Sequence, residues 1–237
     1  MRWSLGIVLA GLLAVLSCSP ADAAGARPEV GPPRSDTSWV ARILRPVSVR
    51  SAPRPGARAV ATARPLAPIG RRRQHLAVLR SAQGGAWIEV RLPRRPNGSK
   101  GWVPADAVYL YRTTHRVEID LSARRLSLFR RGRRLVRVPI AIGAPGTPTP
   151  VGRFAIAERI RTGHPSGFLG PIVFPITGFS RTLNEYAGGD GRVAIHGTSL
   201  PGLIGTRASH GCIRLRNVDI VRIGRVLRAG DPVLIRR

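Results

Sequence analysis

The sequence is poor in cysteine, in acidic residues and in aromatic residues, and each shortage excludes a class of function. Only two of its 237 residues are cysteines, Cys18 and Cys212, which excludes a scaffold of several disulfides. It has 12 acidic residues against 39 basic ones, a formal net charge of +27, and 5% aromatic residues. The basic residues are spread along the chain, and few aromatic side chains are present to stack on bases. This distribution argues against a dedicated nucleic-acid module.

Long apolar runs are also scarce, and the clearest one lies at the N-terminus. A short basic start, Met1-Arg2-Trp3, precedes an apolar stretch at 4–17 that is too short for a comfortable membrane span. Ala21-Asp22-Ala23 then offers a cleavage site before residue 24. We therefore predict a signal peptide at 1–23, no membrane span, and a location in the periplasm or cell wall. Alternatively, the residues before Cys18 resemble a lipoprotein cleavage box, which would make Cys18 a lipid anchor.

The excess of positive charge predicts anionic partners outside the cytoplasm. Lys100 is the only lysine, so the charge comes almost entirely from arginine. Coding preference alone would produce such a bias. Even so, long-range attraction holds a protein this basic near polyanions, and for an exported protein these are cell-wall polymers and anionic lipid headgroups.

Removal of the leader leaves Cys212 as the one remaining thiol, with His196 and His210 close to it in sequence. A thiol needs a nearby base to become a nucleophile at neutral pH. One cysteine and two histidines would also supply three metal ligands, but their spacing matches no zinc pattern. An oxidising compartment further disfavours a structural zinc thiolate. We predict a cysteine nucleophile that uses neither a metal nor another cofactor.

The pattern of turns and short strands predicts a mainly β protein. Residues 24–38 are rich in proline, glycine and alanine and are expected to form a flexible linker. Residues 39–112 contain short apolar stretches at 47–50, 76–79, 87–90 and 101–104, separated by turn residues, which indicates a small barrel. The opening Val-x-Val-Arg, the Trp87 strand and the closing Gly-Trp-Val resemble a bacterial SH3-like domain, a fold that often looks like a wall-binding module.

The second predicted domain covers residues 113–237 and is also mostly β, with one or two short helices. Alternating residues predict strands at 117–121, 126–129 and 135–142. A helix is expected at 218–227, with Val218, Val221, Val226 and Leu227 near one face and Gly230 at its end. A closing strand is expected at 231–235.

Several motifs in this second domain occur in a characteristic order. His196-Gly197-Thr198 is followed, after a glycine-containing loop, by Ser209-His210-Gly211-Cys212 and then by Arg214; upstream stands Thr149-Pro150-Val151-Gly152-Arg153-Phe154. Together they resemble the signature of the bacterial L,D-transpeptidase catalytic domain, from about residue 114 to the C-terminus. The resemblance implies a small SH3-like barrel followed by a mostly-β L,D-transpeptidase domain.

The resemblance also implies roles for individual residues. Cys212 would be the nucleophile and His196 the general acid and base. His210 is a second candidate base, since in an extended segment its side chain would share a face with Cys212. Arg214 would bind a substrate carboxylate, and the backbone around Gly211 and Cys212 would bind an oxyanion. The remaining expected contributors to substrate binding are Gly197, Thr198, Ser209 and Tyr186.

The implied reaction is formation of 3→3 cross-links between tetrapeptide stems of peptidoglycan, through a thioester on Cys212 and with release of D-alanine. β-Lactams of the carbapenem type are implied as covalent inhibitors. Three alternatives remain open: an L,D-carboxypeptidase that uses water as acceptor, a relative that attaches proteins to the wall or cleaves such links, and a non-catalytic wall-binding protein. The first domain carries none of the signature, and we expect it to bind wall polymers and to contribute little to chemistry on soluble stems. The alternative is a packing or positioning domain with no ligand of its own.

Overall fold

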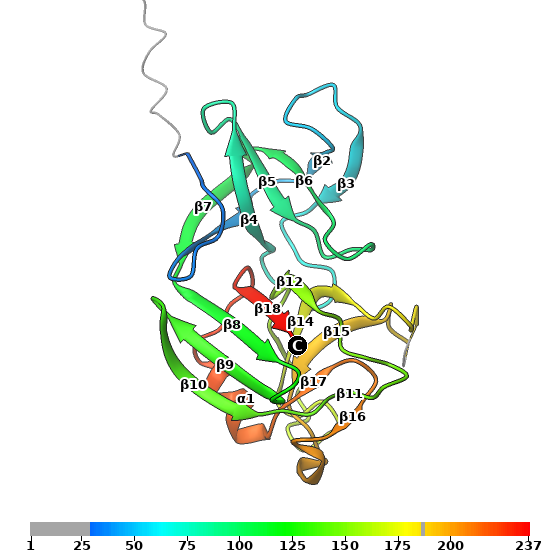
Figure 1. Cartoon of the computed structure of the whole chain (residues 1–237). Coiled ribbons are helices and arrows are strands. Elements are labelled where there is room, and N and C mark those ends of the chain that lie inside the picture. The colour runs from blue at the N-terminus through cyan, green and yellow to red at the C-terminus, as the bar shows by residue number, and fades with distance from the viewer. Residues whose placement is uncertain (1–28, 186–187) are drawn as a thin grey trace, which may run out of the picture.

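The computed structural model describes residues 29–185 and 188–237. The predicted signal peptide, the possible lipid anchor at Cys18 and the site candidate Tyr186 lie outside the described residues. Within them, two β-rich units follow one another along the chain, and Figure 1 shows the first unit standing against one end of the second. Across this part of the chain, no helix is long and apolar enough to cross a membrane.

The N-terminal unit is a seven-stranded antiparallel sheet in the order β3-β2-β6-β5-β4-β1-β7. Its strands contain the four predicted at 47–50, 76–79, 87–90 and 101–104, which are confirmed. Alternate residues point inward, as Val47 and Val49 do in β2, and they form a core of their own. The likeness to an SH3-like domain stays a prediction. The strands are β1 (Ser38–Ile43), β2 (Val47–Arg50), β3 (Ala59–Ala63), β4 (His75–Ala82), β5 (Trp87–Arg91), β6 (Lys100–Pro104) and β7 (Val108–Thr113), with a 3-10 turn η2 (Ala105–Ala107) before β7.

The described part of the expected flexible linker is not free chain. Val30 is buried in the core of the N-terminal unit. Its N–H donates to Ser81 Oγ at 2.8 Å, and its carbonyl accepts from the Ser81 N–H at 2.8 Å. The proline- and glycine-rich composition predicted a flexible linker. One apolar residue, Val30, is nevertheless enough to fix this segment, because its side chain is buried and its backbone is hydrogen-bonded to Ser81.

The second unit contains two larger sheets that share one core. The first has the order β10-β9-β8-β18-β12 and the second the order β13-β14-β15-β17, with a short pair β11-β16 beside them. Side chains from both sheets meet in a single apolar cluster. The strands are β8 (His115–Asp120), β9 (Arg125–Arg130), β10 (Arg133–Pro139), β11 (Ile142–Gly143), β12 (Gly152–Ala155), β13 (Ile160–Arg161), β14 (Ile172–Phe179), β15 (Arg192–His196), β16 (Arg207–Ser209), β17 (Ile213–Arg214) and β18 (Pro232–Arg236); a 3-10 turn η3 (Pro201–Leu203) precedes β16.

The single α-helix of the described residues is shorter than predicted and faces the core differently. It spans α1 (Asn217–Gly224), three residues less than expected at its end. Val218 is 72% exposed and Val221 also faces outward, whereas Ile220 and Ile223 are fully buried. The prediction was wrong for Val218 and Val221, whereas Leu227 is buried in the core and Val226 packs against it. Positions 220, 223, 224 and 227 follow the spacing of a buried helical stripe.

The two units touch where the chain crosses from one to the other. Thr113 Oγ1 at the end of β7 donates a 2.6 Å hydrogen bond to the buried Asp231 carboxyl before β18. A Cβ added to Gly230 would come within 2.4 Å of Val40 in β1, so the backbone of the second unit packs directly on the first. Burial raises the pKa of Asp231 to about 7, with opposing hydrogen bonds from Thr113 and Arg228.

Candidate active site

Parallel pairing of two strands sets the thiol and the imidazole on one face of a sheet. β15 and β17 pair with His196 opposite Arg214. Two residues earlier in this register, Cys212 lies beside Ala194, and a hydrogen bond with the Ala194 backbone reaches the Cys212 sulfur. Side chains alternate between the faces of a strand, so Ile195 enters the core while residues 194 and 196 share the face of Cys212.

A network of side-chain hydrogen bonds fixes the backbone before the nucleophile. Ser209 Oγ donates to the Cys212 carbonyl at 2.6 Å and accepts from the Gly211 N–H at 3.2 Å. Thr149 Oγ1 donates to the Gly211 carbonyl at 2.9 Å and accepts from the Gly143 N–H at the same distance. Gly211 has a φ of 111°, a conformation that L side chains rarely adopt. Thr149 belongs to the upstream motif, and this contact gives that motif a structural role that the sequence did not reveal.

The tautomer of His196 follows from its one close partner. The ring is buried, and Nδ1 lies 2.6 Å from the Gly197 carbonyl oxygen. A carbonyl only accepts hydrogen bonds, so Nδ1 carries the proton and Nε2 keeps its lone pair. Burial lowers the pKa of His196 to about 4; the Gly197 hydrogen bond opposes this shift and the Arg214 charge adds to it. His196 is therefore neutral at pH 7 and able to accept a proton at Nε2.

Cys212 rests in the protonated form for the same reason. Burial raises the pKa of its thiol, while the Ala194 hydrogen bond and the Arg214 charge oppose that rise. The pair therefore rests as a thiol and a neutral imidazole rather than as an ion pair. Proton transfer from sulfur to Nε2 has to accompany attack on a substrate.

Arg214 is buried beside this pair. Its guanidinium lies 4.7 Å from the centre of the Phe168 ring, and that ring lies 6.1 Å from the imidazole of His196. The Nε atom of Arg214 is buried and makes no hydrogen bond to any described residue. The sequence did not predict a role for Phe168, because this residue lies in a loop far from the motifs and no motif surrounds it.

The Gly197-Thr198 segment is held by the first residue of α1. Asn217 Oδ1 accepts a 2.8 Å hydrogen bond from the Thr198 N–H. A Cβ on Gly197 would come within 2.3 Å of the same oxygen, and one on Gly170 within 2.4 Å. Thr198 Oγ1 in turn accepts from the Leu200 N–H at 3.0 Å. Gly197 and Thr198 thus shape the backbone after His196, and Asn217 is a further supporting residue that the sequence left without a role.

A pocket of about 450 Å³ opens beside Cys212. His210 is exposed and lines the same pocket. The positive φ of Gly211 breaks the extended geometry between these two residues, so the alternation argument for their shared face does not hold. The lining is mainly apolar, with Arg161, Asp190 and Arg192 at its polar part. No group of three or more potential metal ligands occurs among residues 29–185 and 188–237.

Protonation of His196 should make the free energy of unfolding depend on pH. Since its pKa is about 6.5 in the unfolded chain and about 4 in the fold, the unfolded state binds more protons between these values. The contribution of His196 to the free energy of unfolding therefore falls as pH drops from 6.5 to 4. We expect wild type to lose up to about 3 kcal/mol relative to a His196→Gln variant over this window. Urea denaturation of both proteins at pH 7 and pH 4.5 measures the difference.

The comparison between the two proteins cancels Asp231, whose raised pKa gives the opposite slope over a similar range. A difference in unfolding free energy that is the same at both pH values would contradict the assigned burial of a neutral His196.

Comparisons with known proteins identify the family. The family model of the L,D-transpeptidase catalytic domain (YkuD) matches residues 114–235. A Bacillus subtilis protein named as L,D-transpeptidase YkuD is 32% identical over 127 residues, 54% of this chain and 69% of that protein. An Escherichia coli K12 protein named as L,D-transpeptidase YbiS is 36% identical over 119 residues, 44% of this chain and 39% of that protein.

Among solved structures, an L,D-transpeptidase from Mycobacterium tuberculosis H37Rv aligns over 83% of this chain and 93% of its own, with 18% identity and a TM-score of 0.46. The chain thus spans about two thirds of one curated relative and well under half of the other. The family model covers half of the chain and both histidines of the site together with the cysteine, and the chain belongs to the L,D-transpeptidase catalytic domain (YkuD) family.

Proposed function

We propose that this chain is a cysteine-dependent L,D-transpeptidase that forms 3→3 cross-links between peptidoglycan stems. The observation that carries the proposal is the β15–β17 register, which sets the Cys212 thiol and the His196 imidazole on one face of the sheet. Of the two, Cys212 lines the pocket. The proposed donor is a tetrapeptide stem, and the proposed acceptor is an amine on a second stem.

In the first half-reaction, Cys212 attacks the carbonyl carbon of the third stem residue while Nε2 of His196 takes the thiol proton. The tetrahedral intermediate needs a donor for its oxyanion. The Gly211 N–H already donates to Ser209, so we assign this role to the Cys212 N–H. Collapse breaks the bond to the terminal D-alanine, whose amine takes the proton from His196. The product is a thioester on Cys212.

In the second half-reaction, the acceptor amine attacks the thioester and gives a proton to His196 Nε2. The carbon–sulfur bond breaks, and the proton returns to the sulfur. The low pKa of His196 suits this sequence, because an imidazolium in a buried site gives up its proton readily to the leaving amine. Arg214, with an unpaired buried Nε, is the proposed ligand of a substrate carboxylate, and His210 at the pocket is the proposed second base.

Turnover of tetrapeptide stems is the direct test. The purified mature protein should yield a cross-linked dimer lighter than two stems by one D-alanine, detected by mass spectrometry. Cys212→Ser should lower this rate at least about a hundredfold, because a hydroxyl is much harder to ionise than a thiol. Its thermal unfolding midpoint, measured in parallel, shows that the fold survives. Tripeptide without dimer would identify the carboxypeptidase alternative, and full activity of Cys212→Ser would refute the mechanism.

Covalent capture by a carbapenem-type β-lactam gives a second test. Such a compound offers a strained acyl carbon to the thiol, so intact-protein mass spectrometry should show one adduct per chain. We expect the adduct on wild type and none on Cys212→Ser. A protein that turns over stems but forms no adduct would show that its pocket rejects the bicyclic ring.

We also propose that the protein binds anionic wall polymers through an arginine-lined cleft between the two units. The cleft has a volume of about 890 Å³ and runs beside the loop before β4. None of its arginines forms an ion pair with a described residue, and the pKa of Arg159 is lowered by burial and by neighbouring guanidinium groups. The arginines are Arg71, Arg72, Arg73, Arg159, Arg161, Arg225 and Arg228.

Sedimentation with purified wall sacculi tests this cleft. Replacing Arg71, Arg72 and Arg73 by Gln should weaken binding at low salt, and the difference should shrink as salt screens the charges over about 8 Å at physiological ionic strength. A control that replaces the exposed Arg130, Arg133 and Arg134 removes the same net charge elsewhere. Equal losses in the two variants would show that net charge alone, and not the cleft, binds the wall.

Export of the protein and its alternative lipid anchor at Cys18 stay predictions of the sequence. Both are consistent with a cell-wall enzyme, and the periplasm or the wall is the proposed location.

A further inference from the structure

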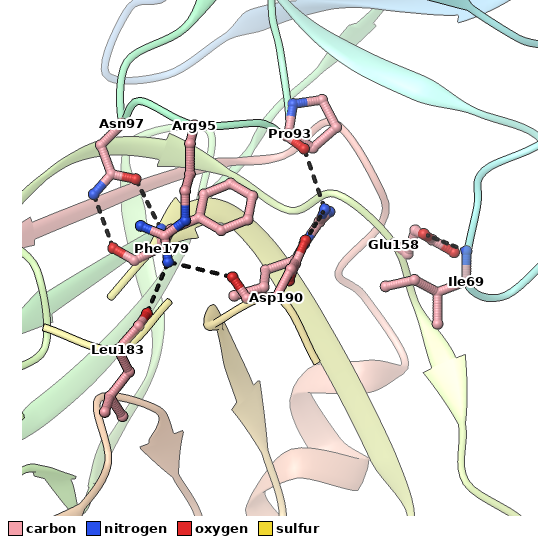
Figure 2. A network of polar contacts seen from close by, with 9 residues as sticks. Ile69, Pro93, Arg95, Asn97, Glu158, Phe179, Leu183 and Asp190 are labelled. Atoms are coloured by element: carbon pink, nitrogen blue, oxygen red, sulfur yellow. Dashed lines mark hydrogen bonds and ion pairs between the residues drawn. The ribbon is translucent and has the colours of Figure 1, made fainter. Parts of the chain in front are cut away.

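The N-terminal unit reaches the pocket at Cys212 from two directions. One contact comes from the chain between β5 and β6, at residues 93–97. The other comes from the loop between β3 and β4, at residues 69–70. Figure 2 shows both sets of polar contacts meeting segments of the second unit. These segments include residues that line the pocket, so the contacts bear on the shape of the site as well as on the join between the units.

Arg95 is the centre of the first contact. Its guanidinium donates to the carbonyl oxygens of Ser180 at 2.9 Å, Leu183 at 2.8 Å and Asp190 at 3.2 Å. All three of these residues line the pocket that contains Cys212. A Cβ on Gly191 would lie 2.7 Å from Arg95 and 2.2 Å from the Leu183 carbonyl, so a glycine is required where the guanidinium sits. One side chain thus ties together two separate stretches of the pocket wall.

Neighbouring residues extend the same contact. The Asn97 side chain donates to the Phe179 carbonyl at 2.9 Å and accepts from the Phe179 N–H at 2.8 Å, which pairs it with the end of β14. Arg192, at the start of β15, donates to the Pro93 carbonyl at 3.2 Å. Both guanidinium groups, of Arg95 and Arg192, also lie about 5 Å from the Phe179 ring centre.

The second contact brings an apolar side chain into the pocket. Glu158 is buried, and its two carboxylate oxygens accept from the Ile69 N–H at 3.2 Å and the Gly70 N–H at 2.6 Å. This fixes the loop so that Ile69 lines the pocket together with Cys212, while the residue remains 53% exposed. An exposed isoleucine that lines a pocket can contact a ligand there, because ligand pockets are lined mainly by apolar side chains.

We propose that the N-terminal unit completes the substrate pocket: Ile69 contacts the aliphatic part of the donor stem, and Arg95 is a positioning residue that holds the opposite wall. This inference rests on the proposed transpeptidase function. It replaces the expectation that the first domain contributes little to chemistry on soluble stems. That expectation arose because nothing in the sequence indicates that loops of the first domain reach the pocket beside the nucleophile.

The test uses the full mature chain and soluble tetrapeptide stems. Ile69→Ala should raise KM about tenfold, the size expected for losing apolar contact in a pocket, and change kcat less than about threefold. Arg95→Gln should raise KM by a similar factor, because the pocket wall loses the hydrogen bonds that hold it, and should change kcat as little. Arg94→Gln is the matched control, because Arg94 donates to Val60 within its own unit and should leave KM unchanged. A small thiol reagent should modify Cys212 at the wild-type rate in all three variants, since the nucleophile itself is untouched.

Hydrogen exchange supplies a readout that does not depend on turnover. The Thr182 and Leu183 N–H groups donate to Ser180 Oγ, so Arg95→Gln should speed their exchange whereas Arg94→Gln should not. If Arg95→Gln misfolds, the exposed Ile69 still tests the pocket. Wild-type KM values in both Ile69→Ala and Arg95→Gln would overturn the inference while leaving the transpeptidase intact. A wild type that does not turn over stems would instead refute the proposed function, and the exchange rates would then decide whether Arg95 holds the wall.

Discussion

The two-residue parallel pairing of β15 with β17 is the constraint on which the site depends. Parallel neighbours need a long crossover, and here residues 197–212 provide it through η3 and β16. A slip of one residue would turn Cys212 toward the core and away from His196. The hydrogen bonds of Ser209 and Thr149 at one end of the crossover, and of Asn217 at the other, fix the backbone where such a slip would begin.

The burial of Cys212 and His196 also opposes formation of the thiolate and the imidazolium that catalysis requires. Burial raises the pKa of Cys212 and lowers that of His196, so both effects favour the uncharged pair. Arg214 acts on both groups in one direction: its positive charge lowers the pKa of the thiol and of the imidazole. It therefore helps to form the thiolate but hinders formation of the imidazolium. A carboxylate that binds Arg214 would relieve that second effect, which gives substrate binding a means to make His196 a better base.

The sequence predicted what is local and missed what is brought together by folding. Strands with alternating residues and the motif around Cys212 are readable because each depends on neighbours within a few positions. The sequence did not predict a role for Phe168, Asn217 or Ile69. Each reaches the site from a distant loop or helix end, and residues of these types are common in such positions. The role of Arg95 could not be predicted for another reason: in a chain with 39 basic residues, the sequence does not distinguish one arginine from the others. The wrong helix face had a third cause, because valines at 218 and 221 offered an apolar spacing that competed with Ile220 and Ile223.

The scarcity of acidic residues explains how so many arginines are accommodated. With 12 carboxylate side chains for 39 basic ones, guanidinium groups must find other partners. They use backbone carbonyls, as Arg95 and Arg192 do across the join between the units, and aromatic faces, as Arg214 does on Phe168. A planar guanidinium suits these partners, because its donors are spread over a fixed fork and its face stacks on an aromatic ring, whereas a lysine ammonium is a compact point charge. Contacts to neutral carbonyls also depend less on ionic strength than ion pairs do, so the join between the units should persist at salt concentrations that release the protein from a polyanion.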